Sequence, residues 1–85
     1  MTPYRIFADI EVINTLRTIR LAQRKKIAEF FEDLKVSPET PGDYSEKADS
    51  GRQFQTKVIG KWAVTYWTDH PVKEVKVEKL ARADY

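Results

Sequence analysis

The stretch that decides the fold runs from Arg52 to Leu80 and reads RQFQTKVIGKWAVTYWTDHPVKEVKVEKL. Polar and apolar side chains alternate there with a period of two, which predicts β-strands over 53–58 and 62–67. Ile59-Gly60-Lys61 between them predicts a tight hairpin turn. A second turn at 69–71 leads into a third strand over 72–80. Three strands joined by short turns predict an antiparallel meander.

The alternation also predicts which face of the sheet each residue occupies. In the first of these strands Gln53, Gln55 and Lys57 share a polar face, and we expect the helices to cover the opposite one. In the next strand the face under the helices is expected to carry Trp62, Val64 and Tyr66. Trp67 then lies on the other face, where an aromatic ring could stack on a base of single-stranded RNA.

The first half of the chain is predicted to be mainly helical. Residues 4–8, preceded by Pro3, form a short β-rich stretch, and Asp9 can cap a following helix. Apolar residues then recur at three- and four-residue spacing, which predicts a helical stripe that faces a core: Val12, Leu16, Ile19, Ile27, Phe30, Phe31 and Leu34. One bent helix or two helices fit this pattern. We favour a helical hairpin, because one helix over 10–35 is long for so small a domain.

Ser37-Pro38 ends the helical pattern, since a residue before proline is disfavoured in the α region. Residues 38–51 are rich in Pro, Gly, Ser and Asp, and we expect a loop, which at this length is either functional or mobile. The predicted order is strand, helix, helix, strand, strand, strand. It indicates one α+β domain over 1–85, in which the helical hairpin packs on one face of an antiparallel sheet. The first strand is expected at the edge of the meander or inserted into it.

Composition narrows the class of protein. The 85 residues contain no cysteine and one histidine, so neither a disulfide nor a structural zinc is expected, and no cofactor. No apolar run reaches the length of a membrane span, and no signal-peptide pattern opens the chain, so we expect a cytoplasmic protein without a membrane partner. The net charge is +2, and residues 52–85 carry seven Lys or Arg against four Asp or Glu. This basic half fits a nucleic acid or an acidic protein partner.

Four segments in this order carry a resemblance to a known family: LKVSP at 34–38, RQFQTKV at 52–58, WAVTYW at 62–67 and the tail KLARADY at 79–85. Together they resemble the RelE/ParE superfamily, the toxins of bacterial type II toxin–antitoxin systems. The resemblance implies the same α+β fold and neutralisation by a cognate antitoxin. RelE-like members cut messenger RNA in the ribosome without a metal, whereas ParE-like members inhibit DNA gyrase and cut nothing.

The resemblance implies a set of site residues. Lys57 matches a lysine of the RelE pattern, Arg82 approximately matches an arginine of the C-terminal segment, and Tyr85 matches a terminal tyrosine; these three are the expected catalytic residues. In the cleavage they imply, the ribose 2′-hydroxyl attacks phosphorus, so the protein supplies position, positive charge and proton transfer. The residues expected to bind RNA are Arg52, Gln55, Lys61 and Trp67.

Other interpretations remain open at this point. Gln55 stands where RelE-like enzymes often have a second lysine, and Ala63 or Trp62 falls near the place of an arginine. These departures leave room for a gyrase inhibitor or a degenerate, non-toxic binding module. His70 beside Pro71 is interpreted as a solvated turn residue. Arg24-Lys25-Lys26 could contact nucleic-acid phosphates, although a solvent-exposed helix face often has this composition.

Overall fold

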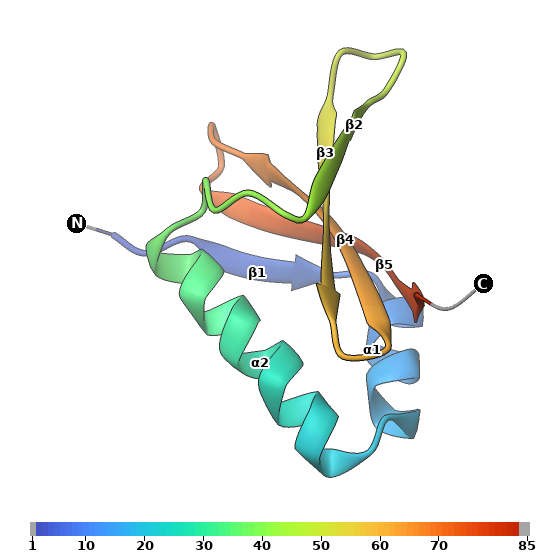
Figure 1. Cartoon of the computed structure of the whole chain (residues 1–85). Coiled ribbons are helices and arrows are strands. Elements are labelled where there is room, and N and C mark those ends of the chain that lie inside the picture. Colours follow the sequence, from blue (N-terminus) through green and yellow to red (C-terminus); the bar gives the residue numbers. More distant parts are fainter. Residues whose placement is uncertain (1, 84–85) are drawn as a thin grey trace.

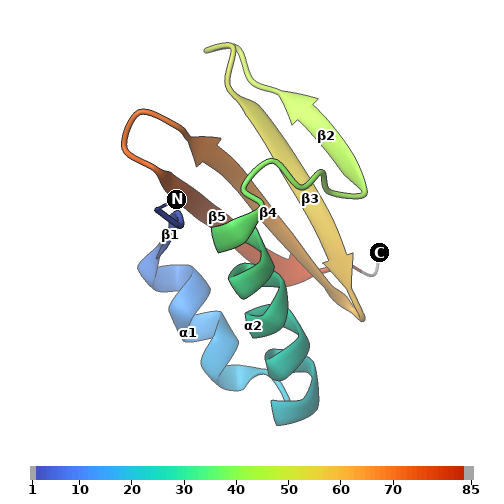
Figure 2. The same cartoon turned by 90° about the vertical axis from the view of Figure 1, so that its left-hand side faces the viewer.

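The computed structural model describes residues 2–83, which form one five-stranded sheet with two helices on one of its faces (Figures 1 and 2). The strand order across the sheet is β1-β5-β4-β3-β2. The elements in chain order are β1 (Arg5–Ala8), α1 (Ile10–Thr18), α2 (Leu21–Val36), β2 (Tyr44–Lys47), β3 (Gln53–Ile59), β4 (Trp62–Asp69) and β5 (Glu74–Arg82).

The meander predicted from the alternating stretch is confirmed. β3 pairs with β4 and β4 pairs with β5, both antiparallel. Gly60 has a φ of 62°, the positive value that a two-residue hairpin turn requires and that glycine adopts without a steric penalty. The second turn is longer than expected, and β5 begins at Glu74 instead of Val72. A register shift between Thr65 and Tyr66 then offsets the rest of the β4–β5 pairing.

The first strand takes the edge position that the sequence left open. β1 pairs in parallel with β5, with Ile6 opposite Val75. The sheet is therefore mixed, which corrects the expectation of a purely antiparallel sheet. A parallel neighbour needs a crossover connection, and the chain from β1 to the meander supplies one through both helices.

The helical region contains two helices, as favoured. The chain leaves the helical conformation at Ile19 and Arg20, whose ψ angles are 140°. Thr18 Oγ1 donates to the Thr15 carbonyl at 2.7 Å, a local bond that competes with helix continuation. Asp9 occupies the N-cap of α1, but its backbone carbonyl, not its side chain, accepts the first bonds. Neither helix is long and apolar enough, within residues 2–83, to cross a membrane.

The core lies between the helices and the central strands, and the predicted helical stripe supplies half of it. Val12, Ile19, Ile27, Phe30 and Leu34 are buried, with Leu16 and Phe31 packed at the border. The sheet contributes the other buried side chains: Val64, Tyr66, Val75, Val77 and Leu80. The Phe30 and Tyr66 rings meet edge to face with centroids 5.5 Å apart, a geometry that aromatic pairs prefer.

One strand was not expected. β2 lies inside the segment predicted as a loop and pairs antiparallel with β3, with Tyr44 opposite Thr56. All four of its side chains are exposed, so no buried alternation marks it in the sequence. The β2–β3 hairpin extends beyond the other strands at the top of Figure 1.

The face assigned to β3 was wrong. Lys57 pairs with Val64 and Gln55 pairs with Tyr66, and directly opposed residues point to the same side of a sheet. Because Val64 and Tyr66 are buried under the helices, Gln55 and Lys57 lie on the helix side as well. The helices cover the sheet centre and leave β3 largely uncovered (Figure 2). Polar residues can therefore occupy the helix side of β3 without being buried.

Candidate functional site

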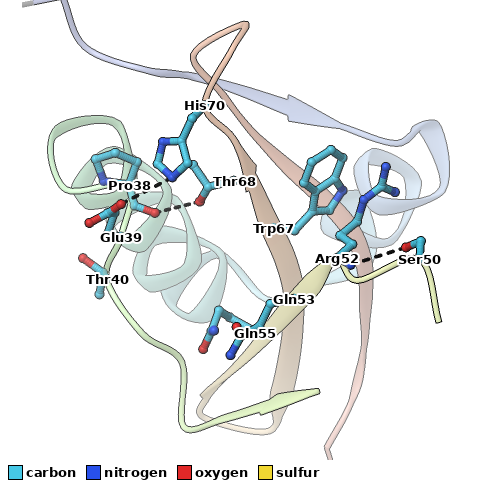
Figure 3. Close-up of a pocket in the computed structure, with 10 residues that line it drawn as sticks. All are labelled: Pro38, Glu39, Thr40, Ser50, Arg52, Gln53, Gln55, Trp67, Thr68 and His70. Carbon is cyan, nitrogen blue, oxygen red and sulfur yellow. Dashed lines mark hydrogen bonds and ion pairs between the residues drawn. The ribbon is translucent and has the colours of Figure 1, made fainter. Parts of the chain in front are cut away.

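A polar cleft opens where the β2–β3 hairpin separates from the end of β4. The β3–β4 pairing stops at Gln55 and Tyr66, and the chain before Gln55 diverges from the chain after Tyr66. The space between them has a volume of about 540 Å³, within the range of small-molecule sites. Figure 3 shows the residues that line this polar cleft: Pro38, Glu39, Thr40, Ser50, Arg52, Gln53, Gln55, Trp67, Thr68 and His70.

Residues 37–43, between α2 and β2, form one wall of the polar cleft, and the sheet holds this wall by its side chains. Each hydrogen bond joins a backbone group of the wall to a hydroxyl or amide side chain of the sheet. The bonds are Tyr66 Oη to the Thr40 carbonyl at 2.9 Å, Thr68 Oγ1 to the Pro38 carbonyl at 2.8 Å, and Gly42 N–H to Gln55 Oε1 at 3.0 Å. The wall is thus fixed to the strands without burying many apolar side chains.

Tyr66 is the most deeply placed of these anchors, with 1% of its surface exposed. Burial first, and then the negative charge of Asp43, raises the pKa of its phenol to about 12. Both causes disfavour the phenolate. The hydroxyl therefore remains a hydrogen-bond donor to Thr40 at every physiological pH.

Lys57 lies just beyond the wall, in an adjoining groove that shares Thr40 with the polar cleft. Its Nζ is 3.7 Å from Asp43 Oδ1, and Asp43 Oδ2 accepts the Val58 N–H at 2.7 Å. A Cβ on Gly42 would lie 2.4 Å from the Thr56 carbonyl oxygen, so only glycine allows the wall to approach β3 this closely. The partly exposed ammonium group of Lys57 is therefore held beside the cleft by its ion pair with Asp43.

Arg52 and Trp67 form a stack at one side of the cleft. The Arg52 guanidinium carbon lies 3.8 Å from the centroid of the Trp67 ring, a cation–π contact. Trp67 Nε1 donates to Glu78 Oε1 at 2.8 Å, which fixes the ring, and Lys76 Nζ lies 5.5 Å from the same centroid. Trp67 does lie on the sheet face away from the helices, as predicted. Arg52 covers part of the ring, so a base would stack on the guanidinium or displace it.

His70 stands at the rim of the cleft and is more than a solvated turn residue. Its Nδ1 lies 2.8 Å from Tyr4 Oη, and its Nε2 lies 3.4 Å from Glu39 Oε1. The Tyr4 and His70 rings also meet edge on, with centroids 5.7 Å apart. Half of the side-chain surface is exposed. The imidazole therefore has partners on both nitrogens and still faces solvent.

A second surface, which we name the cationic end, lies where α1 meets α2. A groove there is lined by Arg20, Lys61, Trp62 and Arg82, among others, and the Arg82 guanidinium lies 5.6 Å from the Trp62 ring. The charged residues that line this groove are all basic, and no acidic residue occurs in the sequence over 12–28 or 57–68. The cationic end consists of Arg17, Arg20, Arg24, Lys25, Lys26, Lys61 and Arg82.

Comparison with solved structures identifies the architecture. The chain superimposes on a chain of the archaeal RelE–RelB complex from Pyrococcus horikoshii OT3 with a TM-score of 0.81, covering 96% of both chains at 21% sequence identity. The chain has the RelE-like fold. A chain of the toxin–antitoxin complex RelBE2 from Mycobacterium tuberculosis aligns at a TM-score of 0.76 and 20% identity, covering 99% of this chain and 97% of that one. No protein-family model and no curated protein matches the sequence.

The RelE-like fold distributes the predicted site residues over two places. Arg52, Gln55 and Trp67 line the polar cleft, with Lys57 in the adjoining groove. Lys61 and Arg82 line the groove at the cationic end, which shares no lining residue with the groove of Lys57. Tyr85 lies outside the described residues. Within residues 2–83, no three His, Cys, Asp or Glu side chains gather in a group that could hold a metal ion.

Several residues that line the polar cleft could not be identified from the sequence. Glu39, Thr40 and Thr68 come from the expected loop and from the end of a strand, and nothing in their local sequence marks them. Gln53 was noticed only as part of a polar strand face. Two adjacent inward positions of β3, Gln55 and Lys57, are polar where a fully covered strand would be apolar, and this is the signal that could have located the site.

Proposed function

We propose that the chain is the toxin of a type II toxin–antitoxin pair and that it cuts ribosome-bound messenger RNA without a metal cofactor. The observation that carries the proposal is the match, over nearly its whole length, to chains of two toxin–antitoxin complexes. Fold alone does not determine function. The two polar surfaces supply the independent support, because one can hold a nucleotide and the other a polyanion.

The polar cleft is the proposed cutting site. Arg52 inside the cleft and Lys57 in the adjoining groove supply positive charge for the phosphate that the 2′-hydroxyl attacks. Charge fixed in place before the reaction lowers the barrier. Gln53 and Gln55 present amide groups that can hydrogen-bond base edges. The wall held by Tyr66 and its neighbours keeps these groups in position. Tyr85 remains a predicted proton-transfer residue.

The cationic end is proposed to hold RNA backbone outside the cutting site. Arg82 and Lys61 line the groove there and act together with the basic turns of the two helices, and the sequence over 12–28 and 57–68 contains no acidic residue. Each phosphate that such a surface neutralises releases counterions, so binding should weaken steeply with salt. Ribosomal RNA is the expected ligand of this surface in the cell.

An antitoxin is the proposed protein partner. Both similar chains come from complexes with one, as the names RelE–RelB and RelBE2 state. An acidic segment would complement a chain with a sequence pI near 8.9. Co-expression with a short adjacent gene, where sequencing of the locus finds one, followed by co-purification, tests this part of the proposal separately from cleavage.

Expression without an antitoxin tests the proposed activity. Growth should stop, and messenger RNA should be cut within translated regions. The double change Lys57→Ala and Arg82→Ala should relieve both effects, because it removes one charge from each surface. Lys79→Ala is the matched control, since Lys79 pairs with Thr65 on the sheet face away from the helices. Equal toxicity of the double variant would remove the proposed site.

Two other outcomes would replace the proposal. Inhibition of gyrase supercoiling by the purified protein, with messenger RNA intact in arrested cells, would indicate a ParE-like inhibitor. Harmless expression from a strong promoter would indicate a binding module. Purified protein added to translating ribosomes distinguishes the first outcome from the proposed function directly, because only a nuclease leaves new RNA ends.

A further inference from the structure

His70 is the chain's single histidine, and the fold brings three distant segments together around it. Tyr4 precedes β1, Glu39 follows α2, and His70 itself opens the β4–β5 turn. Figure 3 shows Glu39 beside His70. A phenol oxygen lies 2.8 Å from one ring nitrogen and a carboxylate oxygen lies 3.4 Å from the other. The phenol oxygen and the carboxylate oxygen can each accept an N–H bond, so either ring nitrogen has an acceptor beside it when it carries a proton.

Hydrogen bonds also fix the backbone on both sides of His70. The His70 carbonyl accepts the Lys73 N–H at 3.1 Å, which closes the turn, and Lys73 adopts a φ of 55°. Two residues earlier, Thr68 Oγ1 bonds to the Pro38 carbonyl and ties β4 to the cleft wall. The ring is therefore positioned at the rim of the polar cleft before any ligand binds, while its exposed half remains accessible.

We propose that His70 is the general acid of the polar cleft and that Glu39 and Tyr4 position it. This inference rests on the proposed RNA cleavage. The 2′-oxygen forms a bond to phosphorus and releases its proton to solvent water. The bond from phosphorus to the 5′-oxygen breaks, and His70 Nε2 gives its proton to that oxygen. The products are a 2′,3′-cyclic phosphate and a 5′-hydroxyl, and the neutral imidazole regains a proton from water.

The substrate must displace Glu39 from His70 Nε2 before the 5′-oxygen can take its place. Glu39 has 80% of its side-chain surface exposed, so it can turn away as the 5′-oxygen arrives. Tyr4 stays on Nδ1 and keeps the ring oriented. The charged and titratable groups around the imidazole from the elements packed near it are Tyr4, Lys35, Glu39, Arg52, Asp69 and Lys73.

Leaving-group substitution tests the acid role on ribosomes programmed with a synthetic messenger RNA. With the natural oxygen leaving group, His70→Gln should cut between about 10² and 10⁴ times more slowly than the wild type. With sulfur in place of the 5′-oxygen at the scissile bond, the leaving thiolate needs no proton, so the variant should cut nearly as fast as the wild type. Equal losses on both substrates would overturn the acid role, and no loss on either would remove His70 from the reaction.

The pH–rate profile of the wild type gives a test that does not depend on a variant folding. On the oxygen substrate the rate should fall as rising pH removes the proton that the general acid must donate, and on the sulfur substrate this limb should be absent. Identical profiles for the two substrates would contradict the proposal. If the wild type cuts neither substrate while the ribosomes are intact, the proposed nuclease function itself fails.

Two positioning variants and one control complete the experiment. Glu39→Gln and Tyr4→Phe should both displace the alkaline limb on the oxygen substrate along the pH axis, which a purely structural role would not do. Tyr4→Phe should also lower the rate, because Tyr4 stays on Nδ1 during the reaction. Val72→Ala changes an exposed side chain of the same turn and should leave rate and profile unchanged. The assigned roles of Glu39 and Tyr4 would be refuted if Val72→Ala also displaced the alkaline limb of the pH–rate profile. They would be refuted equally if neither positioning variant displaced it.

Discussion

Replacing Tyr66 with Phe would test how the cleft wall is held. The change keeps the ring that packs edge to face on Phe30 and removes only the hydroxyl that donates to the Thr40 carbonyl at 2.9 Å. A net hydrogen bond contributes about 1 kcal/mol, and a carbonyl left without its donor adds to the loss. We expect the free energy of unfolding at pH 7 to fall by about 1–2 kcal/mol.

The pH dependence of the same variant gives a sharper test. The pKa of Tyr66 rises from 10.0 to about 12 in the folded protein, so between these values the folded state keeps a proton that the unfolded state has lost. The protonated phenol of Tyr66 therefore makes its full contribution to the free energy of unfolding below pH 10, and this contribution is lost as the pH rises through 12. The wild type should lose on the order of 2 kcal/mol more than Tyr66→Phe across this window.

Urea unfolding, followed by tryptophan fluorescence from pH 7 to pH 12, measures both effects. Thr68→Val is the matched control, because it removes the other hydroxyl anchor of the wall, the 2.8 Å bond to the Pro38 carbonyl, and adds no titrating group. Its free energy of unfolding should be lower than that of the wild type by a similar amount at pH 7. Its curve of unfolding free energy against pH should then run parallel to the wild-type curve. A Tyr66→Phe curve that also runs parallel up to pH 12 would refute the buried, neutral phenol.

Two further predictions concern the wall and the cationic end. Gly42→Ala should destabilise the protein by between about 1 and 3 kcal/mol in thermal unfolding, because its Cβ would meet the Thr56 backbone oxygen at 2.4 Å. Gly51→Ala, with open space around the new Cβ but a φ of +89°, should cost only about 1 kcal/mol, and an equal loss in both would contradict the close approach at Gly42. Lys25→Glu with Lys26→Glu should weaken binding to single-stranded RNA and reduce the slope of log K against log salt by about 1.4. An unchanged slope would exclude both lysines from the phosphate contacts.

The sequence predicted the elements that repeat a strong local pattern. The alternation and the Gly60 turn of the meander persist over several residues, so they indicated β3, β4 and the turn between them. The helical stripe indicated helical structure over this region for a related reason, since three- and four-residue spacing brings side chains onto one face whatever that face packs against. The break at Ile19 and Arg20 has no Gly or Pro to mark it and was inferred from length alone.

β2 and the face of β3 could not be predicted in this way. β2 exposes all four side chains and is held to β3 by backbone bonds, which any sequence can form. The alternation in β3 shows that two faces differ, but it does not show which one the helices approach. The outcome depended on the register with β4, where Lys57 meets Val64, and on helices that cover β3 only in part.

By itself, the sequence determined the class of fold, the meander, the helical stripe and the basic character of the chain, because these are carried by residues near one another. The tertiary structure decided the site. It placed Gln55 and Lys57 on the helix side, separated Arg82 from Lys57, and brought Tyr4 and Glu39 to His70 across 66 and 31 positions of the chain. Such contacts arise only when strands and helices pack, and no local pattern records them.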